Sequence, residues 1–183
     1  MKKITLLVVL VFSAAVFAQA QIALGVKGGL NFANISVEDA LEDPDSRTGF
    51  HFGAFAEVEL GGVHLQPELL FSTKGADFAG SELELSYLEI PILIKKQFAQ
   101  ILNIHAGPQF GILTNAEQEG VEVDEFLKSA DISLVVGAGI NLPAGLVGGA
   151  RYVYGISDID DGFGAEIQNR TFQVYVGWKF AGN

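Results

Sequence analysis

The sequence has 183 residues and no cysteine, and its 22 acidic residues outnumber its 11 lysines and arginines, giving a formal net charge of −11. A chain of this length folds as one domain, the lack of cysteine excludes disulfide bonds, and the acidic excess argues against a nucleic acid partner. No run of about 18 apolar residues occurs after the N-terminal segment, so no transmembrane helix is expected in residues 21–183.

The N-terminal segment has the order of features found in secretory signal peptides. Two lysines follow the first methionine, residues 4–11 are apolar, and the sequence AQA at residues 18–20 fits the rule for cleavage after small residues. We therefore predict that residues 1–20 form a signal peptide that is removed, and that residues 21–183 form a single exported domain.

Eight segments of the remaining chain alternate apolar and mixed residues with a period of two, which is typical of β-strands with two different faces. In chain order they are residues 22–32, 49–60, 63–74, 87–95, 102–112, 131–142, 146–156 and 171–180. In the fourth segment Ile92 belongs to the apolar face, whereas Glu89 and Pro91 belong to the mixed face. We expect Pro91, like Pro67 and Pro108, at a bulge or near a strand end, because proline cannot donate a ladder hydrogen bond.

These segments have about the length that a tilted strand needs to cross a bilayer. Their connections alternate between short turns near residues 61–62, 98–100 and 143–144 and longer loops at residues 33–47, 75–82, 114–129 and 157–168. A sheet in lipid must also close, because an open edge would leave backbone groups without partners. The predicted fold is therefore all-β: an eight-stranded antiparallel up-and-down transmembrane β-barrel with short periplasmic turns and longer acidic extracellular loops.

The alternative fold is a soluble lipocalin-like barrel that carries an apolar ligand, with its apolar face pointing inward. The distribution of charge favours the membrane barrel, because the apolar face is nearly free of charge and the mixed face is balanced. The charged residues of the mixed face are Lys27, Glu57, Glu59, Glu68, Lys74, Glu89, Lys95, Asp131, Arg151 and Lys179. A sealed interior requires such a balance, since an unpaired buried charge is costly.

We predict that some of these charges form a network in the middle of the barrel, because they lie at similar distances from the short turns. The predicted members are Lys27, Glu57, Glu68, Glu89 and Arg151. The planar guanidinium of Arg151 is expected to contact more than one carboxylate.

No catalytic residue is predicted. The histidines His51, His64 and His105 all fall on the mixed face, and no spacing links one of them to a serine and a carboxylate near a membrane rim. We therefore predict a non-enzymatic protein with a structural role or a binding role for its loops. An outer-membrane enzyme that modifies lipid is the alternative function.

The long loops carry most of the acidic residues. Asp158, Asp160 and Asp161 in the last loop are weak candidates for Ca²⁺ ligands, because Gln168 stands where a full calcium loop has a bidentate glutamate. We expect Ca²⁺ or Mg²⁺ to bind these loops loosely at several places, and no other cofactor. The acidic surface should attract a cationic or protein partner.

Several stretches spread over the chain resemble one known family. They read GVKGGLNFANIS (25–36), GFHFGAF (49–55), LQPELLFSTKG (65–75), YLEIPILIK (87–95), AGPQFGIL (106–113) and VGAGI (136–140). In this ordered series the chain is similar to the PorT-like family of small outer-membrane β-barrel proteins. The resemblance implies an eight-stranded barrel in the outer-membrane lipid bilayer of a diderm bacterium, exported by its signal peptide and inserted by the barrel assembly machinery. It implies no particular activity.

Overall fold

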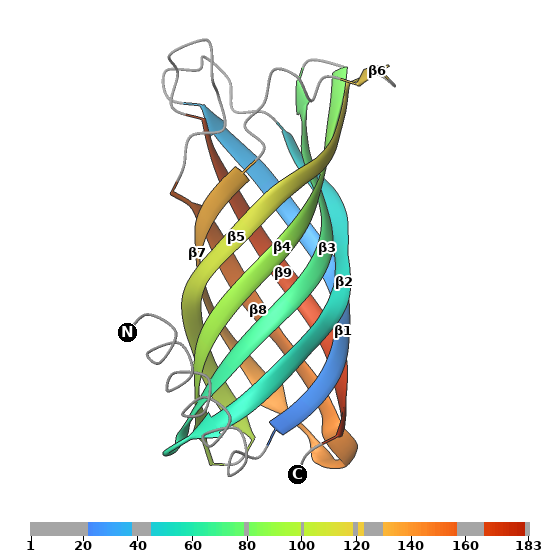
Figure 1. Ribbon diagram of the computed structural model, residues 1–183. Coiled ribbons are helices and arrows are strands. Elements are labelled where there is room, and N and C mark those ends of the chain that lie inside the picture. Colours follow the sequence, from blue (N-terminus) through green and yellow to red (C-terminus); the bar gives the residue numbers. More distant parts are fainter. Residues whose placement is uncertain are drawn as a thin grey trace, which may run out of the picture.

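The protein is a closed antiparallel barrel, seen in a computed structural model that describes residues 22–37, 45–78, 81–99, 101–118, 121–122, 130–156 and 167–181. Its strands are β1 (Ile22–Val37), β2 (Asp45–Leu60), β3 (Val63–Phe78), β4 (Ser81–Phe98), β5 (Leu102–Gln118), β6 (Val121–Glu122), β7 (Ala130–Asn141), β8 (Leu146–Gly155) and β9 (Ile167–Ala181). The short strand β6 pairs with the last residues of β5, and the other eight strands form the wall of the barrel (Figure 1).

Closure of the barrel comes from pairing of the first and last strands. β1 is hydrogen-bonded to both β2 and β9, and β4 to both β3 and β5, all in antiparallel register. The start of β1 and the end of β9 lie at the same end as the short connections (Figure 1). The predicted eight-stranded barrel is therefore confirmed. No helix among the described residues is long and apolar enough to cross a membrane.

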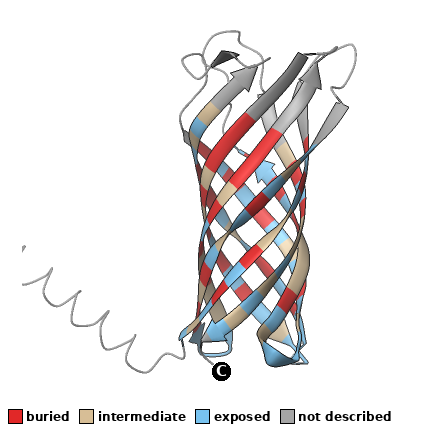
Figure 2. Ribbon diagram, turned by 90° about the vertical axis from the view of Figure 1, so that its right-hand side faces the viewer, coloured by how far each residue is buried: buried red, intermediate tan, exposed pale blue. Residues whose placement is uncertain are grey.

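Burial alternates along each strand as the period of two predicts, and it identifies the outer face (Figure 2). On β7 Asp131, Ser133 and Val135 are buried, whereas Ile132 and Leu134 between them are exposed. The lipocalin-like alternative is therefore wrong, because the large apolar side chains point outward and the polar ones point into the barrel. A face of this kind is the surface that a barrel presents to lipid.

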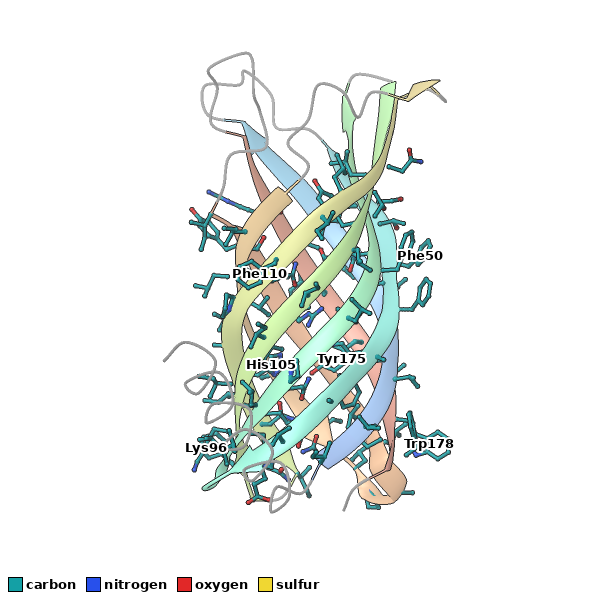
Figure 3. All side chains as sticks on the ribbon, in the orientation of Figure 1. Phe50, Lys96, His105, Phe110, Tyr175 and Trp178 are labelled. Carbon is teal, nitrogen blue, oxygen red and sulfur yellow. The ribbon has the colours of Figure 1, made fainter. Side chains whose placement is uncertain are left out.

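Aromatic side chains gather on the outer face at both ends of the apolar band. Phe50 stacks with Phe52, and both contact Phe71, on the strands β2 and β3. At the opposite end Trp178 projects outward (Figure 3) and donates its indole N–H to the carbonyl of Ala144 in the β7–β8 connection. Aromatic girdles of this kind mark the two interfaces between lipid and water.

The strands run further than the apolar pattern predicts. The loop expected at residues 75–82 is wrong, because β3 continues to Phe78 and β4 begins at Ser81. The loop expected at residues 33–47 is shorter than predicted, because β1 reaches Val37 and β2 begins at Asp45. Beyond the bilayer a strand is held by its ladder hydrogen bonds alone and has no face toward lipid. Polar residues can therefore continue the strand, and the sequence there shows no apolar alternation from which to predict it.

The positions of the three strand prolines also differ from expectation. Pro67, Pro91 and Pro108 lie inside β3, β4 and β5, and no register shift occurs beside them. Instead the pairing is interrupted beside each one: between β2 and β3 at Pro67, between β3 and β4 at Pro91, and between β4 and β5 at Pro108. Each missing N–H therefore removes a rung without displacing the strand.

Glycines on the inner face leave space for long side chains. A Cβ on Gly149 would lie 2.6 Å from the hydroxyl oxygen of Tyr175, and one on Gly137 would lie 2.6 Å from Cβ of Arg151. The glycines therefore allow large polar side chains to share the narrow lumen of an eight-stranded barrel.

Candidate functional site in the barrel interior

Three charged side chains meet in the middle of the lumen, from strands that are not neighbours. Nζ of Lys27 on β1 lies 2.5 Å from Oε2 of Glu68 on β3, and Nη1 of Arg151 on β8 donates to the same oxygen at 2.8 Å. Gly53 on β2 is the ladder partner of Lys27. Because Gly53 has no side chain, Lys27 reaches across β2 to the carboxylate on β3.

Neutral amides extend this central cluster around the barrel. Nε of Arg151 donates to Oε1 of Gln173 at 2.5 Å, and Nε2 of Gln173 donates to Oδ1 of Asn31 at 2.9 Å. Asn31 is also hydrogen-bonded to His51 and donates to the hydroxyl of Ser72. One continuous polar chain therefore joins the strands β1, β2, β3, β8 and β9.

A second cluster surrounds Glu57 near the short-turn end. Lys95 donates to Oε2 of Glu57 at 2.6 Å, while His64 and Lys179 lie 3.2 Å and 3.7 Å from Oε1. Gln66 links this cluster to the central one, because its carbonyl accepts from Lys95 at 3.2 Å and its amide donates to Glu68 at 2.6 Å. The two clusters therefore form one hydrogen-bonded unit.

A separate ion pair lies in the other half of the lumen. Nζ of Lys74 is 2.5 Å from Oε1 of Glu89, and it stands over the ring of Tyr87 at 5.1 Å from the centroid. All three side chains are buried. Glu89 therefore occupies a polar place on the inner face, which explains how a carboxylate fits within a run of isoleucines and leucines.

The structure brings the predicted network residues together only in part. Lys27, Glu68 and Arg151 are in direct contact, Glu57 joins them through Lys95 and Gln66, and Glu89 pairs with Lys74 instead. Arg151 contacts one carboxylate and one amide rather than several carboxylates. The side chains that sequence reasoning missed are the linkers Gln66, Asn31 and Gln173, which carry no charge and so add nothing to a count of acids and bases.

The interior offers no accessible catalytic constellation among the described residues. His51 and Ser72 are joined through Asn31, but both are almost completely buried in the middle of the barrel, where a lipid substrate cannot reach them. In the same part of the chain no group of three histidine, aspartate or glutamate side chains is arranged to hold a metal ion. Asp158, Asp160 and Asp161 lie outside the described residues.

Apolar side chains complete the filling of the lumen. Leu93, Val135 and Val153 form a buried cluster, and Leu70 is completely buried beside the ladder partner of Lys27. Tyr175 and His105 also lie within the outline of the barrel (Figure 3), with their ring centroids 6.3 Å apart. A small pocket remains near the short-turn end, between Lys27, Lys95 and Tyr175, with room for little more than one water molecule. The middle of the barrel is therefore packed with side chains, as expected for eight strands.

Comparison with known families agrees with this architecture. The family model described as "Outer membrane protein beta-barrel domain" matches residues 17–161, which is most of the chain. The chain belongs to this outer-membrane β-barrel family. As a member of the family, it is an outer-membrane protein that resides in the lipid bilayer, with its exposed apolar face toward lipid. No curated protein matches the sequence.

Solved structures of similar fold include two bacterial surface proteins. The outer-membrane β-barrel superposes on Neisserial surface protein A with a TM-score of 0.60 and 14% identity, over 86% of this chain and 97% of that one. It superposes on Ail, the attachment invasion locus protein of Yersinia pestis, with a TM-score of 0.57 and 14% identity, over 86% and 98% of the two chains. At this identity the likeness concerns the fold alone.

Proposed function

We propose that the protein is a non-enzymatic scaffold of the PorT-like type, in which a closed barrel anchors an acidic binding surface at the extracellular end. The observation that carries this proposal is the filled lumen, where Arg151, Glu68 and Glu89 are almost completely buried and each is in an ion pair. A barrel that is packed in this way supports its loops rigidly and does not need to conduct solutes.

Backbone register supports the acidic surface. At the end of the barrel away from the short turns, acidic residues are ladder partners of one another on successive strands. The two rows are Asp45, Asp77 and Glu82 on β2, β3 and β4, and Glu84, Glu117 and Glu122 on β4, β5 and β6. Acidic residues concentrated at one end of the barrel attract cations. A cationic partner and loosely bound Ca²⁺ or Mg²⁺ are therefore part of the proposal.

The acidic rows favour a different kind of ligand from that of a protein with the same fold. A structure of Ail is described as a complex with the heparin analogue sucrose octasulfate; it superposes with a TM-score of 0.55 and 13% identity, over 87% of this chain and 99% of that chain. A sulfated sugar is a polyanion, and the acidic rows would repel it. We propose a polycationic partner for this chain instead. We also propose that residues 1–20 are removed as a signal peptide and that the barrel assembly machinery inserts the barrel into the membrane.

The absence of conduction is tested in planar bilayers with the refolded protein. We expect no sustained current steps, because buried side chains fill the lumen. Regular, reproducible conductance steps from the pure protein would contradict the scaffold function.

The binding surface is tested with a fluorescent oligolysine peptide. We expect saturable binding that weakens in the double variant Asp77→Asn/Glu117→Gln, which changes one residue in each acidic row. The control is Glu59→Gln, because Glu59 is exposed at the opposite end of β2. Equal loss of binding in the control would show that overall charge, rather than the acidic rows, attracts the peptide.

A further inference from the structure

Two basic side chains point outward from the barrel, one at each end of the apolar band. Among the lysines and arginines whose side chains the structure describes, these are Lys96 on β4 and Arg170 on β9, and the others point into the lumen. Lys96 lies at the short-turn end, where it donates to the carbonyl of Gly62 (Figure 3). Arg170 lies near the start of β9, at the extracellular end. The described outer face therefore has one cation at each end.

Arg170 marks the upper limit of the apolar band on β9. The exposed apolar residues of this strand stand at alternate positions and are Phe180, Trp178, Val176 and Phe172. Arg170 continues the outward-facing row two positions beyond Phe172, while Thr171 between them is buried. A row that changes from apolar to cationic at this point has reached the level of the lipid headgroups.

The ring of Tyr154 supports the guanidinium of Arg170. Tyr154 on β8 is the ladder partner of Arg170, and Cζ of the guanidinium lies over the ring at 5.5 Å from its centroid. Tyr154 and Tyr152 are both exposed on the outer face, as in the aromatic belt at a membrane interface. A guanidinium that lies over a ring keeps the N–H groups in its own plane for an anion.

Arg170 has no anionic partner among the described residues. None of the ion pairs formed by these residues includes Arg170, and its Nε is buried without a hydrogen-bond acceptor. The side chain as a whole is partly exposed, so an anion can approach it from outside the barrel. The acidic rows belong to the strands β2 to β6, whereas Arg170 lies between β8 and β1, so the two surfaces are separate.

We propose that Arg170 and Tyr154 bind the phosphate group of a lipid in the outer leaflet of the membrane. A phosphate accepts two parallel hydrogen bonds from the planar guanidinium, a geometry that lysine cannot provide. The acyl chains of the same lipid would lie against the apolar side chains toward the middle of the band, beginning with Phe172 and Tyr152, which are ladder partners. The site would hold the barrel at a fixed depth in the outer leaflet on the side of β8 and β9.

The test measures lipid binding to the refolded protein in an uncharged detergent by native mass spectrometry. The probes are synthetic lipid A that carries phosphate groups, the same lipid with its phosphate groups removed, and inorganic phosphate as a competitor. We expect the phosphorylated lipid to bind about tenfold more tightly than the dephosphorylated one, because it forms hydrogen bonds between charged groups. Equal binding of the two lipids would overturn the proposal. Displacement of the lipid by inorganic phosphate at a similar concentration would also overturn it, because the site would then recognise free phosphate.

Arg170→Gln should bind the phosphorylated lipid as weakly as the wild type binds the dephosphorylated one. The matched control is Lys96→Gln, which removes the same charge from the outer face at the opposite end of the barrel. We expect the affinity of the control to equal that of the wild type. An equal loss in both variants would mean that any outward-facing charge attracts the lipid, and unchanged affinity in Arg170→Gln would place the lipid elsewhere; either result refutes the assigned site.

A second variant keeps the charge and removes the ring. Tyr154→Leu leaves an apolar side chain on the outer face and should weaken binding of the phosphorylated lipid about two- to fivefold, because the guanidinium loses its contact with the ring. Retention of heat-modifiable gel mobility checks that each variant is folded. Unchanged affinity in Tyr154→Leu would overturn the assignment of the site to the pair Arg170 and Tyr154.

Discussion

Two cations share a single oxygen of Glu68, and this arrangement predicts a strongly non-additive response to mutation. Lys27 and Arg151 lie 2.5 Å and 2.8 Å from the same Oε2 atom, and all three side chains are buried. Replacing either cation by methionine leaves the carboxylate paired with the other one. Replacing both leaves Glu68 as a buried carboxylate without a cation.

The expected magnitudes follow from these contacts. Arg151→Met removes a charge-assisted hydrogen bond to Glu68 and one to Gln173, and should lower the free energy of unfolding by about 2 kcal/mol. Lys27→Met should lower the free energy of unfolding by about 1–2 kcal/mol, because the contact with Glu68 is lost, while the desolvation cost of the buried ammonium group is removed as well. The double variant should lose about 3–5 kcal/mol more than the sum of the two, which is the cost of an uncompensated buried charge.

The assay is urea unfolding of the protein in detergent or lipid vesicles for the wild type, both single variants and the double variant. The four free energies form a double-mutant cycle, whose interaction energy isolates the shared carboxylate. Additivity within about 0.5 kcal/mol would refute the reasoning, because it would mean that water or another group compensates Glu68.

The same unfolding assay tests three further predictions. Ile92→Arg should lower the free energy of unfolding by about 2–4 kcal/mol, since Ile92 lies on the lipid face of β4. An unchanged urea midpoint would mean that this face is in water. Gly107→Ala should lose about 3 kcal/mol, because the new Cβ would lie 2.0 Å from the carbonyl oxygen of Ile92, whereas Gly28→Ala, with its nearest atom at 3.4 Å, is the tolerated control. In Pro108→Ala the new amide N–H at position 108 should be protected from hydrogen exchange, because it can form the hydrogen bond to β4 that proline cannot make. Rapid exchange of this amide would show that the missing proline N–H is not the cause of the gap in the β4–β5 ladder.

The sequence predicts the faces of the strands well because lipid and lumen impose opposite demands on alternate residues. Glu89 and Ile92 are assigned to the correct faces by their parity alone. The upper strand ends were missed, since no apolar demand exists beyond the bilayer and Asp77 or Glu82 reads as a loop residue. Contacts inside the lumen were predicted only in part, because they depend on the register of the whole closed sheet.

The meeting of Lys27 with Glu68 illustrates that dependence. The two residues belong to strands that are not hydrogen-bonded to each other, and they meet because Gly53 leaves a gap on the strand between them. Nothing in the spacing of charges along the chain specifies which glycine will stand between two particular charges. The choice of Lys95 for Glu57 and of Lys74 for Glu89 is hidden from the sequence in the same way.

The interrupted ladders give the barrel wall two sides of unequal stiffness. Each of the three interfaces from β2 to β5 has a gap at its proline, and the β2–β3 and β4–β5 ladders each have a register shift besides, whereas the ladders β5–β7, β7–β8 and β8–β9 run without a gap. A gap in a ladder leaves a short stretch of two neighbouring strands without hydrogen bonds between them, so the wall yields most easily at that place. When the surrounding membrane thins, thickens or is stretched, the barrel therefore deforms first on the side that carries Pro67, Pro91 and Pro108, while the opposite side keeps its shape and holds the Arg151 end of the central cluster in place.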